Sequence, residues 1–477
     1  MRSPELDAVV VGAGPNGLAA AIRLAEAGRD VLVVEAGRTV GGGSRSAELT
    51  LPGYVHDVCA AVMPLGAGSP FLRSLPLEQH GLTWVQPPVP AGHPLDDGTA
   101  VLLHRSVDAT AAGLGSDAAA YRRLVGPLVE RWRDLADASL GPLTDGVRHP
   151  LVMARFGVPG VLSARRLAGS LFRGEPARAL FAGMAGHSIL PLDRPFTAAF
   201  GLVLSVTGHA EGWPVARGGA GRFVDAMASY LRSIGGRIET GRRVTSLADL
   251  PRARVTLFDL DPAQVAAIAG ERLPGGYRRR LRRFRHGPAA FKVDLAIDGP
   301  IPWTAQELLR AGTVHLGGTL REIASGEAAV ARGDHPERPY VLLAQQSLFD
   351  ETRAPAGKHT VWAYCHVPAG STVDMADRIE GQIERFAPGF RDRILARHVT
   401  TPADYARYNL NYVRGDISGG AHDGLQLFAR PLLRPVPYTT PAPDLFICSA
   451  STPPGGGVHG MCGYHAAGAA LRRLRKS

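Results

Sequence analysis

Lysine is nearly missing from this chain of 477 residues, although the chain carries a formal net charge of +10. Only Lys292, Lys358 and Lys476 are lysines, so arginine supplies almost all of the 53 basic residues. Beside so much alanine and glycine, this skew indicates a GC-rich genome, and no nucleic-acid-binding motif accompanies the charge. One arginine-rich segment, from Arg278 to Arg285, is either a solvated helix face or a contact with an anionic membrane surface.

Cysteine is scarce as well, and its four copies are scattered singly at Cys59, Cys365, Cys448 and Cys462. Without any paired spacing, the sequence predicts neither a disulfide framework nor a metal site. Long apolar runs are also missing, because the most apolar stretch, residues 198–206, is far too short to span a membrane. The first residues lack the pattern of a signal peptide. We therefore expect a cytoplasmic protein that at most contacts the inner face of a membrane.

Repeats of a fixed period are not visible, which argues against a solenoid or a propeller. What the chain does contain is an apolar strand at residues 8–11, a helical segment at 18–27 and a second apolar strand at 30–34. This order predicts a βαβ unit with a parallel sheet. A similar unit closes the chain, where the strand at 445–450 precedes a glycine-rich loop and a helix.

Between these two ends the pattern changes from helical to mixed. Residues 109–215 look mostly helical, and strand-like runs then follow at residues 292–297, 340–344 and 360–366. We therefore predict an α/β protein with a Rossmann-like cofactor domain built from discontinuous segments, residues 1–100, 216–290 and 420–477. An α+β substrate-binding domain with a helical subregion is predicted for residues 101–215 and 291–419.

The first motif that carries chemistry is a glycine-rich turn between the first strand and the first helix. Its first glycine permits the tight turn, its second lets a pyrophosphate approach the backbone, and its third lets the helix pack on the strand. The helix N-terminus attracts the phosphates. An acidic residue ends the second strand, where a carboxylate can accept hydrogen bonds from ribose hydroxyls. The predicted dinucleotide contacts are Gly12, Gly14, Pro15, Asn16, Gly17 and Glu35.

A second glycine-rich loop follows Ala36 directly, and the cofactor contacts expected here are Ala36, Gly42, Gly43, Ser44 and Arg45. It resembles the loop after the acidic strand in the glutathione-reductase-like flavoproteins. The resemblance implies that the glycines let the loop run along a ribityl chain and that Arg45 offsets pyrophosphate charge. An NAD-dependent dehydrogenase has no reason for such a loop here, so FAD is the expected cofactor.

The third motif lies near the end of the chain, where a strand leads into five glycines within nine residues and then into a helix. Backbone amides converge on such a loop, and the helix N-terminus can face the electron-rich edge of a flavin. The flavin contacts expected from this loop are Ala450, Gly457, Val458, His459 and Met461.

Together the motifs resemble the phytoene-desaturase-like branch of the FAD-dependent oxidoreductases with the amine-oxidase fold, over nearly the whole chain. The likeness rests on Glu35 and on residues 9–17, 41–46, 52–57, 217–219 and 454–467. It implies FAD and hydride abstraction from a large apolar substrate, such as an isoprenoid, a lipid-like molecule or a natural-product intermediate. It also implies that the backbone of Val244 contacts the adenine. The hairpin that usually follows this valine is nearly absent, which puts the adenine's placement near Phe258 in question.

Few groups in the sequence are candidates for catalysis, which fits a flavin reaction in which the protein mainly positions the substrate and excludes water. Lys292 opens a strand that resembles the amine-oxidase strand whose lysine holds a water near flavin N5. The alternative is a strand-edge lysine that pairs with Asp294 or solvent. His56 and His459 lie in or beside the flavin loops, either as structural residues or as catalytic bases.

A second dinucleotide motif is not visible, so NADPH is not expected as the reductant, and electrons should leave the reduced flavin for O2 or a quinone. The leading hypothesis is an oxidase or desaturase of an apolar substrate. One alternative is a flavin amine oxidase, which the aromatic content of 6% disfavours. The others are a non-redox double-bond isomerase that uses reduced FAD and a flavin-binding scaffold.

Overall fold

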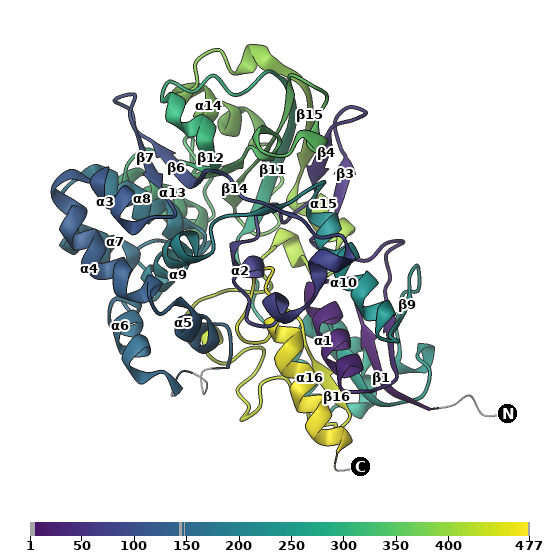
Figure 1. Cartoon of the computed structure of the whole chain (residues 1–477). Coiled ribbons are helices and arrows are strands. Elements are labelled where there is room, and N and C mark those ends of the chain that lie inside the picture. The colour runs from purple at the N-terminus through teal and green to yellow at the C-terminus, as the bar shows by residue number, and fades with distance from the viewer. Residues whose placement is uncertain (1–4, 143–145, 147, 476–477) are drawn as a thin grey trace.

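The computed structural model describes residues 5–142, 146 and 148–475, and two large β-sheets organise them (Figure 1). Five parallel strands form the first sheet, in the order β16-β10-β1-β2-β9. They are β1 (Leu6–Val11), β2 (Val31–Val34), β9 (Arg237–Glu239), β10 (Ala253–Phe258) and β16 (Leu445–Ile447). The predicted return of the chain to its first domain is confirmed, because this sheet combines strands from both ends of the chain and from its middle.

Burial on both faces explains why β1 is stable at the centre of this sheet. Ala8 and Val10 belong to one apolar core, whereas Val9 and Val11 belong to another on the opposite face. The first core includes side chains of α1 (Pro15–Glu26), α10 (Ala220–Ser233) and α16 (Met461–Leu474). The second includes side chains of α11 (Pro262–Ile268) and α12 (Gly275–Arg282). A parallel sheet covered on both faces needs the continuous apolar strands that the sequence contains.

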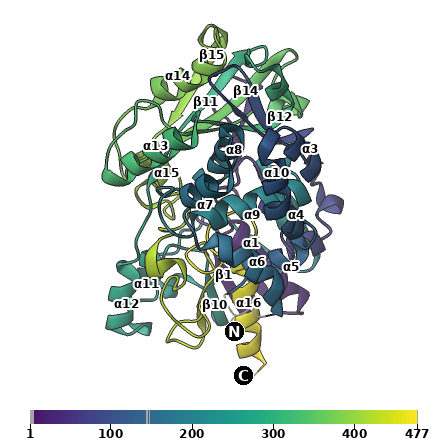
Figure 2. The ribbon, with the colours of Figure 1, turned by 90° about the vertical axis from the view of Figure 1, so that its left-hand side faces the viewer.

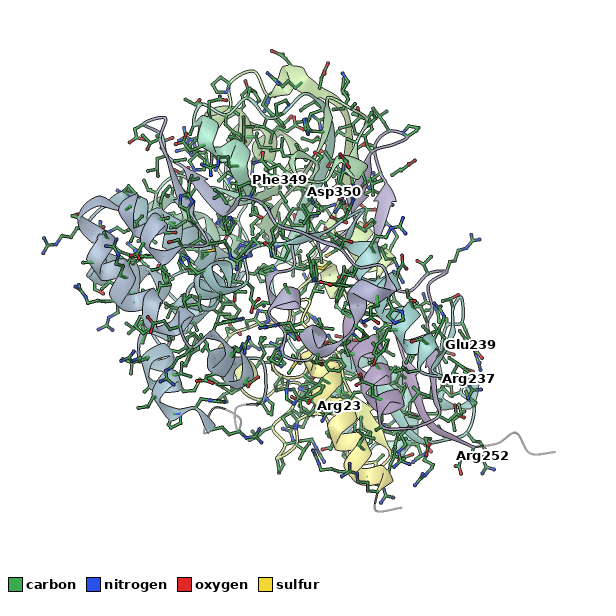
Figure 3. The ribbon with its side chains drawn as sticks, in the orientation of Figure 1. Arg23, Arg237, Glu239, Arg252, Phe349 and Asp350 are labelled. Carbon is green, nitrogen blue, oxygen red and sulfur yellow. The ribbon has the colours of Figure 1, made fainter. Side chains whose placement is uncertain are left out.

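The last helix, α16, packs along the first helix, α1, so that segments from the two ends of the chain lie side by side (Figure 1). Gly463 permits this close approach, because a Cβ atom there would overlap the backbone carbonyl of Asn16. Arg23 of α1 lies between the two helices (Figure 3). It donates a hydrogen bond to the carbonyl oxygen of Tyr464, and its guanidinium carbon lies 3.6 Å from the centre of the Tyr464 ring.

Seven strands form the second sheet, in the order β15-β11-β14-β13-β12-β6-β7. All neighbours are antiparallel except β12 and β6. The strands are β6 (Val89–Pro94), β7 (Ala100–Leu103), β11 (Ala289–Asp298), β12 (Ala311–Leu316), β13 (Val341–Ala344), β14 (Lys358–Val367) and β15 (Ile394–Thr400). The helices in this part of the chain are α13 (Leu320–Arg332), α14 (Ala376–Phe386) and α15 (Pro402–Tyr408). Our domain boundary at residue 100 stays a prediction, and the pairing of β6 with β12 favours a boundary before Val89.

The predicted helical subregion is confirmed between β7 and the short strand β8 (Val215–Ala216), which pairs with β5 (Trp84–Val85). Its helices are α3 (Val107–Ala112), α4 (Ala118–Val129), α5 (Trp132–Ser139), α6 (Pro150–Gly160), α7 (Ala164–Leu171), α8 (Glu175–Gly186) and α9 (Thr197–Ala210). In the turned view, α11 and α12 lie at the lower left, away from α3 and α4 (Figure 2). None of the helices among the described residues is both long enough and apolar enough to cross a membrane.

Two shorter segments border the cofactor domain. A hairpin of β3 (Ser46–Glu48) and β4 (Val55–Asp57) follows the second glycine-rich loop, and the one-turn helix α2 (Pro64–Ala67) comes after it. Between β9 and β10 the chain, which is described throughout this stretch, forms a short 3-10 helix (Leu247–Asp249) and no strand. The predicted loss of the hairpin before β10 is therefore confirmed.

Candidate functional site

Three glycine-rich turns meet around a cavity of about 320 Å³. The turn after β1 contributes residues 14–16, the loop after β2 contributes residues 42–44, and the loop after β16 contributes residues 449–451 and 456–458. All three follow the carboxyl ends of parallel strands, where open α/β sheets bind their ligands. The sequence placed these motifs at opposite ends of the chain, and the structure brings them together.

Close packing and one carboxylate hold the first turn closed. A Cβ atom on Gly17 would overlap the carbonyl oxygen of Gly12, so the third glycine lets α1 approach β1, as predicted. Glu35 accepts hydrogen bonds from the backbone amides of Ala13, at 2.7 Å, and Gly37, at 2.6 Å. The carboxylate therefore ties the first turn to the second loop. The oxygen that accepts from Ala13 keeps a further lone pair that a ribose hydroxyl could use.

Arg45 holds the second loop in shape. Its guanidinium donates hydrogen bonds to the carbonyl oxygens of Val40, at 3.0 Å, and Gly42, at 3.3 Å. Its Nη2 atom lies 3.3 Å from a carboxylate oxygen of Glu35. In this conformation the guanidinium contacts its own loop and Glu35. Arg45 does not line the cavity. Its predicted contact with a pyrophosphate stays a prediction.

His459 closes the first turn of α16. Its Nδ1 atom accepts a hydrogen bond from the backbone amide of Met461 at 3.0 Å, and its carbonyl oxygen accepts one from the Ser69 hydroxyl at 2.7 Å. Burial lowers the pKa of His459 to about 4, so the ring is neutral at neutral pH. This geometry favours the structural role that the sequence left open, and a catalytic role stays a prediction.

The chemistry of the cavity wall fits a dinucleotide. Asn16 Oδ1 and Ser44 Oγ are buried atoms with no hydrogen-bond partner among the described residues, and both residues line the cavity. Buried polar atoms in proteins nearly always have a partner, which points to a polar ligand here. Helix α1 begins at Pro15 beside the cavity, and its N-cap residue, Gly14, has no side chain to cap it. Because Pro15 has no N–H and the Gly17 amide is already hydrogen-bonded, the Asn16 amide is the one in this turn that can receive a phosphate.

Of the predicted cofactor contacts, nine line the cavity: Gly14, Pro15, Asn16, Gly42, Gly43, Ser44, Ala450, Gly457 and Val458. The other predicted contacts do not line it, and they are Gly12, Gly17, Glu35, Ala36, Arg45, Val244, His459 and Met461. Among these, Val244 packs in the buried cluster that also contains Phe258, at the end of the first sheet. The adenine contact of Val244 stays a prediction.

Asp259, the residue directly after β10, was missed by the sequence analysis. Its carboxylate lines the cavity and accepts a hydrogen bond from the backbone amide of Gly17 at 2.9 Å. A Cβ atom on Gly14 would lie 2.8 Å from the same carboxylate oxygen. Burial raises the pKa of Asp259 to about 7, and the charge of Glu35 adds to the rise. An acidic residue at the carboxyl end of an apolar strand was the available signal.

A buried charge cluster surrounds Lys292. The fully buried ammonium group donates hydrogen bonds to the Asp294 carboxylate and, at 2.8 Å, to the carbonyl oxygen of Asp57. His56 Nδ1 lies 3.6 Å from the other oxygen of Asp294. Burial, helped by the charge of Lys292, lowers the pKa of His56 to about 3. Lys292 is thus paired with Asp294, as one reading of the sequence had it. It lies in β11, however, which pairs with a strand on each side, so its placement at a strand edge is wrong.

Neither Lys292 nor His56 lines the cavity, and their catalytic roles stay predictions. The ammonium group of Lys292 lies 5.9 Å from the centre of the Trp362 ring, and this ring does line the cavity. The indole nitrogen of Trp362 donates a hydrogen bond to the carbonyl oxygen of Cys59 at 3.1 Å. A change of charge at Lys292 would therefore alter the electrostatic potential at the Trp362 ring, which lines the cavity.

The side chain of Asp57 connects this cluster to the rest of the molecule. Its carboxylate accepts hydrogen bonds from Arg353, at 3.0 Å, from the Ser46 hydroxyl, at 2.7 Å, and from the Ala220 amide, at 2.7 Å. Arg353 also pairs with Asp350 at 2.9 Å, in the upper part of the molecule (Figure 3). These bonds join the segment between β13 and β14 to α10. Across residues 5–142, 146 and 148–475, no group of three or more His, Cys, Asp or Glu side chains could hold a metal ion.

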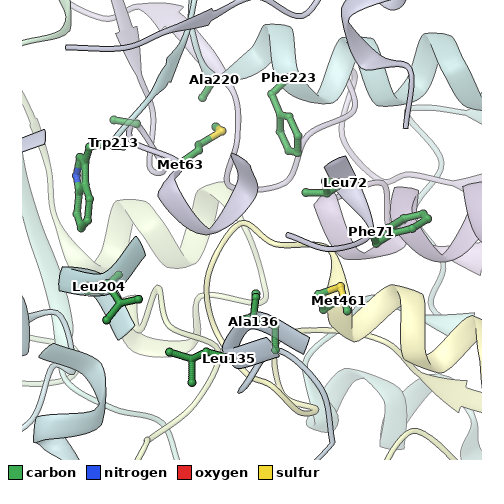
Figure 4. Packing of buried hydrophobic residues seen from close by; sticks show 14 of the residues in the cluster. Met63, Phe71, Leu72, Leu135, Ala136, Leu204, Trp213, Ala220, Phe223 and Met461 are labelled. Atoms are coloured by element: carbon green, nitrogen blue, oxygen red, sulfur yellow. The ribbon is translucent and has the colours of Figure 1, made fainter. Parts of the chain in front are cut away.

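The rest of the cavity wall is largely apolar and aromatic. Trp362 and Tyr364 of β14 line it with their ring centres 5.0 Å apart. Leu204 of α9 and Trp213 line it as well, and both belong to the large buried apolar cluster (Figure 4). Aromatic residues are few in the chain, yet several of them gather at this one cavity. A surface of this kind suits an apolar substrate.

The family model described as an NAD(P)-binding Rossmann-like domain matches residues 10–75. The chain is similar to pyridine nucleotide-disulfide oxidoreductase domain-containing protein 2 of Mus musculus, at 28% identity over 99% of this chain and 94% of that protein. It is also similar to the phytoene dehydrogenase of Streptomyces griseus, at 27% identity over 83% of this chain and 79% of that protein.

Among solved structures, the chain resembles an oxidoreductase from Methanosarcina mazei, with a TM-score of 0.66 and 18% identity over 98% of this chain and 100% of that one. It also resembles cyclohexylamine oxidase from Brevibacterium oxydans IH-35A, with a TM-score of 0.59 and 17% identity over 99% of each chain. At such identities these likenesses show the fold alone. From the relatives and the fold together, the chain is an oxidoreductase that resembles a phytoene dehydrogenase in sequence and shares the fold of an amine oxidase.

Proposed function

We propose that this oxidoreductase binds FAD and removes a hydride from a large apolar substrate, with O2 or a quinone as the final electron acceptor. The observation that carries the proposal is the cavity where the three glycine-rich turns meet a wall that is largely apolar and aromatic. The turns supply backbone amides for a pyrophosphate, and the apolar wall supplies a dry site for a hydrocarbon.

FAD would supply the hydride acceptor. The chain's own residues would bind the cofactor, orient the substrate and exclude water from the site. Residues 14–16 would hold the pyrophosphate, Glu35 would accept hydrogen bonds from the ribose, and Ser44 and Asn16 would contact the polar chain of the cofactor. The rings of Trp213 and Trp362 would exclude water from the substrate side, which strengthens electrostatic interactions at the reacting atoms.

The first test is the identity of the bound cofactor. We expect the purified protein to be yellow and to release FAD on denaturation. Release of FMN, or of no flavin after attempted reconstitution, would contradict the proposal. The second test is anaerobic mixing with candidate isoprenoids and lipids. The flavin of an oxidase or desaturase loses its colour when the substrate is added. An isomerase converts its substrate only after the flavin has been reduced beforehand, and a scaffold shows neither behaviour.

One observation favours an amine oxidase as a second candidate. Four aromatic rings line the cavity, at Trp213, Trp362, Tyr364 and Tyr412, although the chain has few aromatic residues. Such rings can hold an amine beside the flavin through cation–π contacts. Anaerobic bleaching by primary or secondary amines, with no response to isoprenoids, would favour this candidate.

A contact with an anionic membrane surface remains part of the proposal. Arg279, Arg280, Arg282 and Arg283 are exposed at the end of α12, and Arg285, exposed beside them, pairs with Asp423 at 2.5 Å. A cluster of this kind is attracted to acidic lipids. Sedimentation with vesicles that contain phosphatidylglycerol, but not with neutral vesicles, would support the contact.

A further inference from the structure

A pair of histidines stands at the apolar part of the cavity. His187, which follows α8, lines the cavity, and its Nε2 atom lies 2.9 Å from Nε2 of His315 on β12. Because two imidazole nitrogens can share only one hydrogen at this distance, one ring donates and the other accepts. The Nδ1 atom of His187 is the one left for a ligand in the cavity.

Both rings are neutral at neutral pH. Burial lowers the pKa of His187 to about 3 and holds that of His315 well below its ordinary value. The groups that face the pair from neighbouring elements are His93 on β6 and Tyr340 directly before β13, and beyond Tyr340 lies His366, which pairs with Glu327. No carboxylate pairs with either ring among the described residues, so the pair is held as two neutral tautomers.

A neutral pair of this kind can serve two purposes at the cavity. When His187 donates through Nε2, its Nδ1 atom is a bare acceptor, and when it accepts through Nε2, its Nδ1 atom carries the hydrogen. The Nδ1 atom of His187 can therefore accept a hydrogen bond from a ligand or donate one to it, and His315 takes the complementary tautomer in each case.

Thr313 supplies a second polar atom at the same place. Its Oγ1 atom is buried without a hydrogen-bond partner among the described residues, and the residue lines the cavity. It lies two positions before His315 on β12, so both side chains project from the same face of the strand. The wall around them contains Trp213 and Leu342. An unsatisfied buried hydroxyl in an apolar wall is uncommon and points to a polar atom of a ligand.

The other cavity residues decide which kind of polar atom fits. None of the described lining residues is a lysine or an arginine, so an anionic group would find no cation there. The carboxylates that line the cavity, Asp259 and Asp261, follow β10 on the side of the glycine-rich turns, so a cationic group would find no partner beside Thr313. A neutral group remains. A hydroxyl both donates and accepts, so it matches either tautomer of His187 and the hydroxyl of Thr313.

We propose that this part of the cavity binds the hydroxyl group of an otherwise apolar substrate, through His187 and Thr313. The inference names a substrate class for the proposed oxidoreductase and rests on that function. It predicts an apolar alcohol, such as a hydroxylated isoprenoid or lipid, in preference to a pure hydrocarbon.

The test compares two isomeric probes on the full-length protein after incubation with FAD. One is 1-octanol, and the other is 1-methoxyheptane, which has the same heavy atoms but no O–H group. Binding is read from tryptophan fluorescence, because Trp213 and Trp362 line the cavity. We expect 1-octanol to bind at least about fivefold more tightly, as one net hydrogen bond requires.

The variants His187→Phe and Thr313→Val should each reduce this preference to less than about twofold, because each removes a polar atom at nearly constant volume. The control Leu204→Val should weaken both probes alike and keep the preference. Thr313→Val is close to isosteric, so it carries the test if His187→Phe does not fold. Loss of the preference in either folded variant supports the site.

Equal affinity of the parent for both probes, binding of neither, or a preference retained in both variants overturns the proposal. Flavin content is measured on the same samples, which separates this inference from the proposed function. A protein that binds 1-octanol selectively yet never takes up FAD would overturn the proposed function and leave the hydroxyl site standing.

Discussion

The carboxylate of Asp259 occupies the N-terminus of α1, where it accepts a hydrogen bond from the backbone amide of Gly17 at 2.9 Å. This is the place where a dinucleotide fold attracts phosphates. Burial raises the pKa of Asp259 to about 7, so near neutral pH the side chain changes between an uncharged acid and an anion. The anion would repel a pyrophosphate, and the neutral acid would not.

We therefore predict that the affinity for FAD falls as the pH rises from 6 to 8, on the order of tenfold, because two anions would then share one turn. Asp259→Asn should bind FAD with little pH dependence over this range. The measurement is the Kd from flavin fluorescence in the apoprotein at several pH values. The exposed residue Asp225 provides the control Asp225→Asn, which should behave like the parent. A pH dependence that survives in Asp259→Asn would assign it to another group.

The same titration bears on stability. A carboxyl group whose pKa is raised in the folded state binds more protons when folded than when unfolded. The free energy of unfolding of the apoprotein should therefore decrease as the pH rises from about 4 to about 7, and Asp259→Asn should reduce that decrease. Urea titrations of the apoprotein at several pH values measure the effect.

Gly14→Val should abolish binding of FAD. The added side chain would meet the Asp259 carboxylate, which lies 2.8 Å from the position of a Cβ atom, and would fill the space that a pyrophosphate needs. Gly169→Val is the matched control, because Gly169 is exposed on α7 with no atom within 4 Å of a Cβ. Stoichiometric FAD in Gly14→Val would show that the phosphates bind elsewhere.

Gly463→Ala should destabilise the protein by about 1–3 kcal/mol, because the new methyl group would force α16 away from Asn16. Gly169→Ala makes the same chemical change in an open helical position, where alanine should stabilise by up to about 1 kcal/mol. Thermal unfolding of the two variants measures the difference. Equal melting temperatures would mean that α16 can move away from α1 at little cost in free energy.

Lys292→Met should lower the free energy of unfolding by about 3–5 kcal/mol, because it leaves the Asp294 carboxylate buried without its cation. The double variant Lys292→Met, Asp294→Asn should recover most of that loss. Stopped-flow measurement of both half-reactions in the double variant then isolates the proposed catalytic effect. Slow reoxidation by O2 at restored stability would support a role for the lysine charge, and unchanged rates would leave Lys292 with the structural role alone.

NADH and NADPH should reduce the bound flavin slowly or not at all. The described residues contain one Rossmann-like parallel sheet, and we assign its glycine-rich turns to FAD. Anaerobic mixing with either nucleotide, followed at the flavin absorbance maximum, checks this expectation. Fast and saturable bleaching would contradict it and would require a second nucleotide site.

Local patterns were enough to predict the glycine-rich turns that meet at the cavity. The glycines of the first turn and Glu35 belong to a single βαβ unit, in which each residue type follows from a contact a few positions away. Asp259, His187 and Thr313 could not be found in this way. Each is a single polar residue near or within an apolar segment, and its role depends on which distant elements end beside the cavity. The domain boundary predicted at residue 100 depends on such long-range contacts as well, because β6 pairs with β12 far along the chain.

The position of β1 in the first sheet affects how the chain folds as it is synthesised. Val9 pairs with Leu32 on one side, but on the other side it pairs with Thr256, roughly 250 residues later. Until the ribosome has made β10, the central strand has an open apolar edge, and until it has made α16, one face of α1 has no cover. Nascent chains with such edges aggregate or need chaperones, so yield in the cell should depend on the rate of translation between β2 and β10.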